Sequence, residues 1–306
     1  MQHDDTNRLT MSEMNAQTNS HTNGGTASSE QQPATMYVRH YTVTQWALDL
    51  SLLLITIAVY IQLEFNSRSH ELGFFCDDQT IQLPYKSSII PTWTLILGLV
   101  IVAAIVRRLQ ITTVECCHYY IWSSEQWRGN VVYRFNNRFS IHPLFVHIYL
   151  YNGLALYGAF LSECLVNFGK ITVGRLRPHF IDVCGLPNST LSFCAANPHA
   201  YVPPELTNCT QTNHKKYWNS RMSFPSGHAS ISFYGAALMM MYIHDRGGLN
   251  KLKSVGVELV VHTLLLITAS YVTYTRYIDH HHHPFDLIVG AIVGVFFAVM
   301  VRLFTI

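Results

Sequence analysis

The sequence predicts an all-α integral membrane protein: a bundle of six transmembrane helices with a long extracytoplasmic loop and a disordered N-terminus. Of its 306 residues, 49% are hydrophobic and only 12% are charged, whereas about a quarter of the residues of a typical soluble domain are charged. A helix needs roughly 20 apolar residues to cross the hydrocarbon core of a bilayer. The apolar runs that approach this length are Gln45–Leu63, Ile89–Val106, Leu144–Val166, Ala229–Ile243, Val255–Tyr274 and Leu287–Phe304.

Residues 1–36 differ in composition from the rest of the chain. They are rich in Asn, Thr, Ser, Gln and Gly and contain almost no aliphatic side chains. Such a segment buries too little apolar surface to offset the entropy lost on ordering. We therefore expect a disordered cytosolic tail over 1–36, followed by one membrane domain over 37–306. The tail lacks an apolar stretch behind a basic start, so it is not a cleaved signal peptide, and the first span acts as the signal anchor.

The fourth apolar run is the weakest of the six. Ala229–Ile243 is shorter than the others and spans the membrane only if Ser226 and His228 lie at the membrane edge. A buried helix of a soluble core is the alternative for this segment alone. Six spans remain the better account.

An even number of spans places both termini on one side of the membrane, and we expect that side to be the cytosol. Lys and Arg residues are almost equally divided between the two sides, so the positive-inside rule contributes little. Both glycosylation sequons, at Asn188 and Asn208, lie in the loop 167–227. This loop is therefore expected to face the lumen or the cell exterior.

Four cysteines gather on the same side as the sequons. An oxidising compartment would allow them to pair, and four cysteines have three possible connectivities, among which the sequence does not choose. These residues are Cys76, Cys184, Cys194 and Cys209.

Three polar clusters also lie on this side of the membrane. The first, 170–178, follows the third span, the second, 224–228, directly precedes the fourth, and the third, 275–286, joins the fifth to the sixth. No span separates the first two clusters and two spans separate the second from the third. The clusters therefore face the same compartment, as the parts of an active site must.

The side chains of these clusters suit an anion. Lys170 and Arg177 are seven residues apart, about two helical turns, so both are expected on one helix face. With Arg276 they form a cationic pocket without a matching carboxylate cluster, and arginine forks fit phosphate oxygens. Ser226 and Gly227 stand at the entrance of the fourth span, where backbone N–H groups are free to bind an anion.

The third cluster contains four consecutive histidines, His280 to His283. A neutral imidazole attacks phosphorus and carries the phosphoryl group when a carboxylate fixes its tautomer. Asp286 is four residues from His282 and three from His283, and spacing alone prefers neither. A histidine tract also binds transition metals, but the positive pocket would repel a dication, so we assign no metal to it.

Three motifs, in this order, resemble the signature motifs of the type 2 phosphatidate phosphatase superfamily. They are Lys-x6-Arg-Pro from Lys170, Pro-Ser-Gly-His ending at His228, and Arg-x5-His-x3-Asp from Arg276. The strings GRLRPHFIDVC and FPSGHAS are similar to the lipid phosphate phosphatase branch. The resemblance extends from about residue 45 to the C-terminus and includes the six-span layout. The family spacing falls on His282, and one departure is Thr275, where the family usually has Ser.

The resemblance implies a mechanism. His282 attacks the phosphate monoester and becomes phosphohistidine, with Asp286 orienting it, while His228 protonates the leaving alcohol and then activates water. No metal or other cofactor is implied, because cationic side chains replace the usual magnesium. The implied phosphate-binding residues are Lys170, Arg177, Ser226, Gly227 and Arg276.

The resemblance indicates a lipid phosphate phosphohydrolase acting on phosphatidate, lysophosphatidate, sphingosine 1-phosphate or ceramide 1-phosphate at the extracytoplasmic face. The alternatives are a phosphotransferase of the same superfamily and a non-catalytic membrane signalling relative. The expected partners are the lipid substrate, the bilayer and further copies of the chain. The formal charge of +2, with no basic block, argues against nucleic acid. The plasma membrane is the expected location, and an internal membrane would give the same sidedness.

Several other ionisable residues match no required motif position. Arg175, Lys215 and Lys216 are interpreted as solvated charges or headgroup contacts. Ionisable groups within spans are functional candidates by default, but bonding between helices explains them equally well. The residues left out of the site for this reason are Asp49, Glu163, Glu258 and His262.

Overall fold

A computed structural model describes residues 37–66, 68–91, 93–95, 98, 131–135, 139–141, 143–247 and 255–305. The long helices are α2 (Val43–Phe65), α5 (Pro143–Val173), α10 (Gly227–Gly247), α11 (Val255–Ile278) and α12 (Pro284–Thr305). They contain most of the described residues, so the helical class predicted from composition is confirmed. The expected tail, 1–36, lies outside the described residues.

Four helices in the described part are long and apolar enough to cross a membrane, which makes the chain a membrane protein. They are Val43–Phe65, Tyr149–Val173, Val255–Ile278 and Pro284–Phe304. Helix α10 forms where the fourth span was expected but does not reach the apolarity of these four. The second expected span, Ile89–Val106, lies mostly outside the described residues, so the count of six stays a prediction.

The chain divides into two compact units. The first comprises residues 1–52 and 103–152. Its described part contains a three-stranded sheet in which β1 (Tyr37–Tyr41) is parallel to β3 (Val131–Phe135), and β3 is antiparallel to β4 (Phe139–Ile141). These strands were not expected. They consist largely of aromatic and β-branched residues, which favour strands where no membrane span forms.

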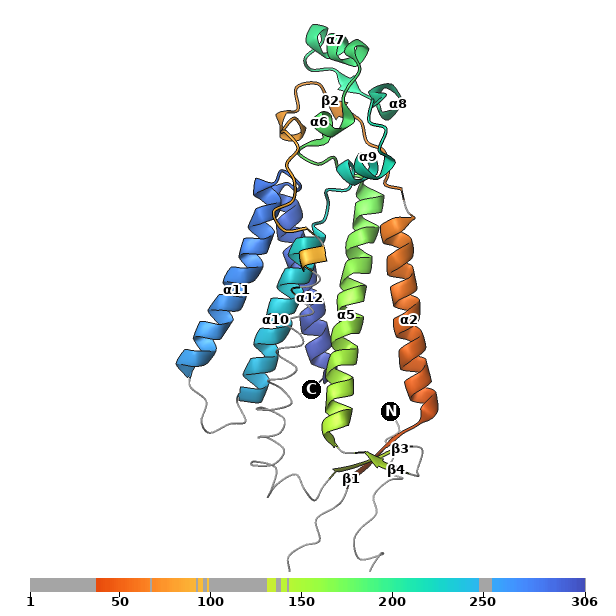
Figure 1. Ribbon diagram of the computed structural model, residues 1–306, viewed down its shortest axis with the longest axis vertical. Helices are drawn as coiled ribbons and strands as arrows, with labels where there is room; N and C mark the ends of the chain where they lie inside the picture. The colour runs from red at the N-terminus through yellow and green to blue at the C-terminus, as the bar shows by residue number, and fades with distance from the viewer. Residues whose placement is uncertain are drawn as a thin grey trace, which may run out of the picture. The chain divides into compact units, whose positions relative to one another are not determined.

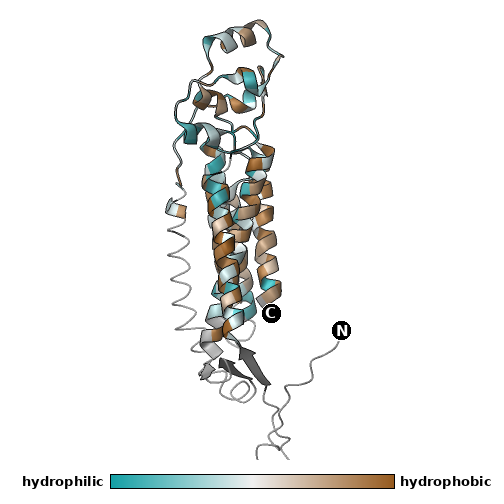
Figure 2. Ribbon diagram, turned by 90° about the vertical axis from the view of Figure 1, so that its right-hand side faces the viewer, coloured by the Kyte–Doolittle hydropathy of each residue, from teal (hydrophilic) through white to brown (hydrophobic). Residues whose placement is uncertain are grey.

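The second unit, residues 53–102 and 153–306, holds the candidate site. Helices α10, α11 and α12 lie beside one another, and α10 packs most extensively against α12 (Figure 1). A side chain at Gly294 would place its Cβ 2.1 Å from the carbonyl oxygen of Ser230, so only glycine permits this approach of the two backbones. Apolar residues cover the middle of the helices, and a more polar cap lies at one end (Figure 2).

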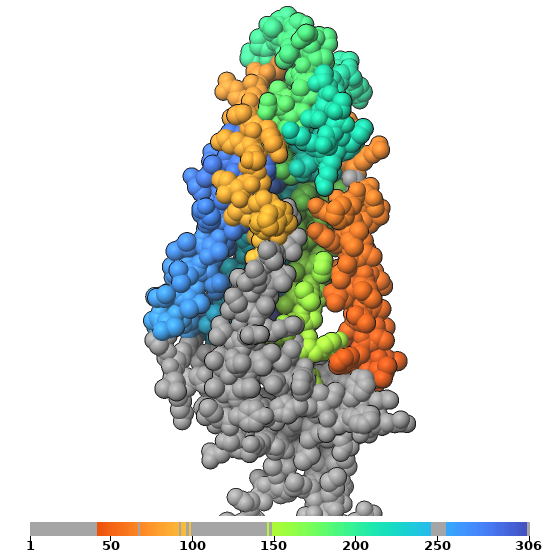
Figure 3. All heavy atoms as spheres, viewed as in Figure 1, coloured from red at the N-terminus to blue at the C-terminus, as the bar shows by residue number. Residues whose placement is uncertain are grey.

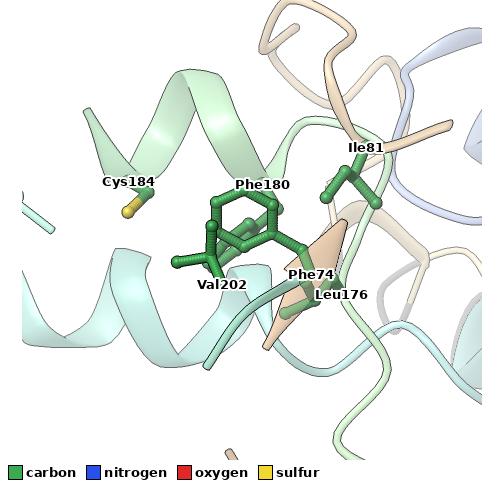
Figure 4. Close-up of a cluster of buried hydrophobic side chains, with 6 residues drawn as sticks. All are labelled: Phe74, Ile81, Leu176, Phe180, Cys184 and Val202. Atoms are coloured by element: carbon green, nitrogen blue, oxygen red, sulfur yellow. The ribbon is translucent and has the colours of Figure 1, made fainter. Parts of the chain in front are cut away.

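The cap consists of short elements around a small hydrophobic core. The helices of the cap are α6 (Phe180–Cys184), α7 (Asn188–Ala196), α8 (Pro204–Thr207) and α9 (His214–Ser220). Strand β2 (Phe74–Phe75) pairs with β5 (Tyr201–Val202), and the 3-10 helix η1 covers Gln79–Ile81. Figure 4 shows the core around the ring of Phe180, which is fully buried. The other members are Phe74, Ile81, Leu176, Cys184 and Val202.

Two disulfides hold the cap together, Cys76–Cys194 and Cys184–Cys209. They use all four cysteines expected on this side and select one of the three possible pairings. Cys76–Cys194 links the loop after α2 to α7 across 118 residues of sequence.

Candidate active site

The first polar cluster begins inside α5 and not after it. Lys170 lies in the last turn of the helix, which ends at Val173. Gly174 has φ of +61°, and its N–H donates to the carbonyl of Lys170 at 3.1 Å. A left-handed glycine closes a helix in this way. Arg177 therefore lies beyond the helix, and the expectation that Lys170 and Arg177 share one helical face is wrong.

Arg177 is held by the segment that leads into α10. Its side chain is 7% exposed, and Nη2 donates to Oδ1 of Asn219 at 2.9 Å while Nε donates to the carbonyl of Met222 at 3.3 Å. Its backbone N–H donates to the carbonyl of Ser220 at 2.8 Å. Burial, with a further contribution from Arg276, lowers the pKa of Arg177 to about 10, so it stays charged at neutral pH.

The second cluster opens α10. Gly227 is the first helical residue, so backbone N–H groups of the first turn lack partners within the helix. Ser226 is fully buried, and its Oγ has no hydrogen-bond partner among the described residues. Nε2 of His228 is also buried and has no hydrogen-bond partner among the described residues, while its ring hydrogen-bonds to the backbone of Ile90. Ser226 Oγ and His228 Nε2 are therefore available to a polar ligand at the start of α10.

The four histidines contact four different sets of partners. His280 adopts φ of +59° after α11, and its Nδ1 hydrogen-bonds to the carbonyl of Pro84 at 2.8 Å. The ring of His281 faces Tyr85 and His179, with ring centroids 6.0 and 5.0 Å away. Nδ1 of His283 lies 3.3 Å from Oδ2 of Asp286. His282 is buried between the other clusters.

Asp286 does not hold His282 directly, which corrects the expected contact. Nδ1 of His282 donates to the backbone carbonyl of Ser223 at 2.6 Å. The fully buried Asp286 carboxylate instead accepts from Ser223 Oγ at 2.6 Å and from the His283 N–H at 3.0 Å. The reason is that Asp286 lies on α12 with His283 in the turn just before it, whereas His282 turns toward Ser223. Ser223 therefore lies between Asp286 and His282 and bonds to both.

Arg175 belongs to this network, which corrects its interpretation as a solvated charge without a role, although its side chain stays 37% exposed. Its Nη1 lies 2.7 Å from Oδ1 of Asp286, and its carbonyl accepts from the Ser223 N–H at 2.9 Å. Three segments distant in sequence thus meet at Asp286 and Ser223. The sequence holds one hint of this role: Arg175 and Arg177 are two positions apart, which would place both on the same side of an extended backbone.

Arg276 has a carboxylate partner that the sequence interpretation missed. Its Nη2 lies 2.9 Å from Oδ2 of Asp279, both side chains are 2% exposed, and Nη1 also donates to Ser88. Asp279 accepts in addition from the Ile89 N–H at 2.8 Å. The ion pair lies within one helical turn, at the i and i+3 positions, so the spacing could have indicated it.

Residues 82–91 form a strap that contacts all three clusters. The strap donates from Leu83 N to the carbonyl of Pro178 at 2.9 Å and from Lys86 Nζ to the carbonyl of Ile278 at 3.2 Å. Figure 3 shows this segment, in orange and yellow, on the surface below the cap. Together with the contacts of Pro84, Ser88, Ile89 and Ile90 described above, these bonds bind the strap to the first, second and third clusters.

The electrostatic setting keeps the central histidines neutral. Burial, then the charge of Arg177, lowers the pKa of His282 well below its ordinary value. The same causes lower the pKa of His179 to about 4 and that of His281 to about 2. The charge of Lys170 also acts on His282, and the charges of Arg276, Lys170 and Arg177 act on His228. The result is a neutral imidazole at His282 under the influence of the positive charges of Arg177 and Lys170.

Fold and site together define a helical membrane protein with a buried cluster of histidine and arginine side chains. Residues 152–305 match the PAP2 superfamily. The chain is 30% identical over 261 residues to phospholipid phosphatase 1 of Mus musculus, covering 84% of this chain and 83% of the relative. It belongs to the PAP2 superfamily, and the resemblance to the lipid phosphate phosphatase branch is confirmed.

Two invertebrate relatives give the same picture. The chain is 28% identical over 241 residues to a putative phosphatidate phosphatase of Drosophila melanogaster, covering 76% of this chain. It is 33% identical over 226 residues to the phospholipid phosphatase homolog 1.2 homolog of Caenorhabditis elegans, covering 71% of this chain. The match spans 60% of the length of each of these two relatives.

Proposed function

We propose that this protein is a lipid phosphate phosphohydrolase that works through a phosphohistidine at His282. The observation that carries the proposal is the environment of His282: its imidazole is buried and kept neutral, and Arg177, Lys170 and His228 are near enough to influence its charge. The names of the relatives, phospholipid phosphatase and phosphatidate phosphatase, support a lipid phosphate as substrate. The proposed substrates are phosphatidate, lysophosphatidate, sphingosine 1-phosphate and ceramide 1-phosphate.

The hydrogen bond of His282 supports its role as nucleophile. A backbone carbonyl only accepts hydrogen bonds, so Nδ1 of His282 carries the proton in its bond to Ser223. The lone pair of Nε2 is then free to attack phosphorus. Nε2 forms the bond to phosphorus as the bond to the ester oxygen breaks, and the departing alcohol takes its proton from the imidazolium form of His228, which is left neutral. In the second half of the reaction His228 takes a proton from water, which displaces His282 from the phosphoryl group.

The remaining residues bind the phosphate group. Lys170, Arg177 and Arg276 supply positive charge, and Ser226 Oγ and the Gly227 N–H supply donors at the start of α10. Donors that are in place before the reaction stabilise the charge that develops in the transition state. We propose that these cations take the place of a metal ion. Asp286 orients His282 by holding Ser223, and Arg175 in turn holds Asp286.

We propose that the pocket opens on the extracytoplasmic side, with both termini in the cytosol, six spans in total and the plasma membrane as location. The two disulfides of the cap support an oxidising compartment. Asn188 and Asn208 are exposed on the cap, as glycosylation requires. Partial removal of N-glycans should increase the electrophoretic mobility of the wild type in two steps. N188Q and N208Q should each eliminate one of these two steps. An unglycosylated wild type from a eukaryotic host would contradict this orientation.

The catalytic proposal is tested by phosphate release from short-chain phosphatidate in excess EDTA. The comparison is between the wild type, His282→Ala and His280→Ala. The last is a matched change in the same histidine run, at a ring that hydrogen-bonds to the strap carbonyl of Pro84. We expect His282→Ala to abolish both turnover and acid-labile labelling of the protein by phosphate, and His280→Ala to retain both. Activity lost to EDTA, or kept by His282→Ala, would refute the phosphohistidine mechanism.

The two alternatives give different products. A phosphotransferase of the superfamily would pass the phosphoryl group to an added alcohol in preference to water, and a non-catalytic relative would release no phosphate. Assembly into homo-oligomers is also proposed, from the family resemblance alone, and light scattering in detergent would test it.

A further inference from the structure

Glu163 is a buried carboxyl group at the edge of the proposed phosphate pocket that the mechanism above does not use. It lies on α5, seven residues before Lys170. Its Oε2 lies 3.0 Å from the point where a Cβ on Gly227 would stand, and Nζ of Lys170 lies 3.6 Å from the same point. The carboxyl group, the ammonium group and the first residue of α10 therefore border one small space.

The neighbouring packing confines Glu163 to this place. Helix α5 is held against α10 by a hydrogen bond of 2.8 Å between the Oγ atoms of Ser162 and Ser230. Val166, one turn further along α5, is fully buried and also borders Gly227. Oε1 of Glu163 is buried and has no hydrogen-bond partner in the described part of the chain. A buried polar atom without a partner next to a ligand pocket indicates a contact that the ligand completes.

The charges around Glu163 do not neutralise it. On its own helix Lys170 is the nearest cation, but Nζ of Lys170 donates to Oδ1 of Asn167 at 2.8 Å. Cys164 is the other titratable neighbour on α5, and Glu64 and Tyr60 face Glu163 from α2. On α10 the residue next to the Glu163 carboxyl group is Gly227, which has no ionisable side chain. An ionised Glu163 would therefore repel the phosphate dianion that Lys170 and Gly227 attract.

We propose that Glu163 takes up a proton from solvent when a phosphate group enters the pocket, and that the resulting hydroxyl donates a hydrogen bond to a phosphate oxygen. The inference rests on the proposed function, since it assumes that the phosphate lies between Lys170 and Gly227. It makes phosphate binding, and hence substrate and product binding, dependent on pH through one identified side chain. The proton returns to solvent when inorganic phosphate leaves.

Proton uptake on binding of inorganic phosphate is the direct test. Calorimetric titrations of the detergent-solubilised protein in two buffers of different ionisation enthalpy give the number of protons taken up per phosphate bound. Measurements between about pH 6 and pH 9 cover the range in which phosphate groups become fully dianionic. The variant is Glu163→Gln, which keeps the shape and a donor but cannot ionise. The matched control is Glu258→Gln on α11, whose carboxylate bonds to His244 at 2.9 Å.

Per phosphate bound, the wild type and Glu258→Gln should take up as much as about one proton more than Glu163→Gln. The ionisation of phosphate itself is common to all three proteins, so the difference reports on Glu163. At pH values at which Glu163 is ionised in the free protein, the affinity of the wild type for phosphate should fall about tenfold per pH unit relative to that of Glu163→Gln. Equal uptake and parallel pH profiles in wild type and Glu163→Gln would overturn the role of Glu163 while leaving the phosphate site intact. No phosphate binding by the wild type would overturn the pocket itself, and with it the proposed function.

The wild type alone keeps the inference testable if Glu163→Gln fails to fold. Above about pH 8 free phosphate is mainly the dianion, so a complex in which Glu163 is protonated must take up a proton on binding. Zero uptake over the whole range above this pH would overturn the proposal.

Discussion

Replacing Ser223 by alanine tests the relay between Asp286 and His282. Ser223 is fully buried, and its Oγ donates to the fully buried Asp286 carboxylate at 2.6 Å while its carbonyl holds Nδ1 of His282. The substitution removes the hydroxyl but leaves the carbonyl. If Asp286 orients His282 through Ser223, the change should weaken catalysis although no proposed phosphate ligand is touched.

The size of the effect follows from the type of bond. A hydrogen bond to a charged group contributes about 1.5–3 kcal/mol, and both partners are shielded from solvent. Asp286 retains Arg175 and the His283 N–H as partners, so the carboxylate stays ionised and in place. If the bond acts mainly on the geometry of the transition state, kcat should fall about ten- to a hundredfold, with KM within about twofold of the wild type.

The assay is steady-state phosphate release from short-chain phosphatidate, with Ser232→Ala as matched control. Ser232 is a buried serine of α10 whose Oγ has no partner among the described residues. Thermal unfolding of both variants separates a catalytic loss from a general loss of stability. A kcat of Ser223→Ala equal to that of Ser232→Ala would refute the relay, and a raised KM at unchanged kcat would place Ser223 in substrate binding instead.

Two further predictions concern stability, both measured by thermal unfolding in detergent. Because the pKa values of His179, His281 and His282 are lowered in the fold from about 6.5 in an unfolded chain, the unfolded state binds more protons as pH falls. The free energy of unfolding should therefore be greatest above about pH 6.5 and should fall below it, by about 1.4 kcal/mol per pH unit for each such histidine. His281→Asn should make this fall less steep, whereas the exposed control His199→Asn should not. A flat profile down to pH 5, or equal slopes in the two variants, would contradict the prediction. Removing the Cys76–Cys194 disulfide by a double change to serine should cost about 2–5 kcal/mol, whereas Cys164→Ser, at a cysteine outside both disulfides, should cost far less; equal losses would count against a stabilising role for the bridge.

The helices were predictable because their signals are local. Runs of apolar residues predicted α2, α5, α11 and α12 to within a few residues at most ends, since hydropathy and length decide whether a segment spans the bilayer. The largest error, the end of α5 at Val173 instead of Val166, arises because the helix continues past the apolar run until Gly174 closes it. The short strands and short helices of the cap have no comparable local signal.

The sequence by itself determined the membrane class, the motif residues and, through the parity of the predicted spans, the expectation that three polar clusters share one side. Those conclusions depend on residue type and on spacing along the chain. Only the tertiary structure decided that Asp286 bonds to His283, Ser223 and Arg175 and not to His282. It also decided that the cysteines pair as 76–194 and 184–209. The contacts of the strap with all three clusters, and the position of Glu163 beside Gly227, likewise come from the tertiary structure. Most of these contacts join residues 25 to well over 100 positions apart in the chain, and spacing along the chain says nothing of distances set by packing.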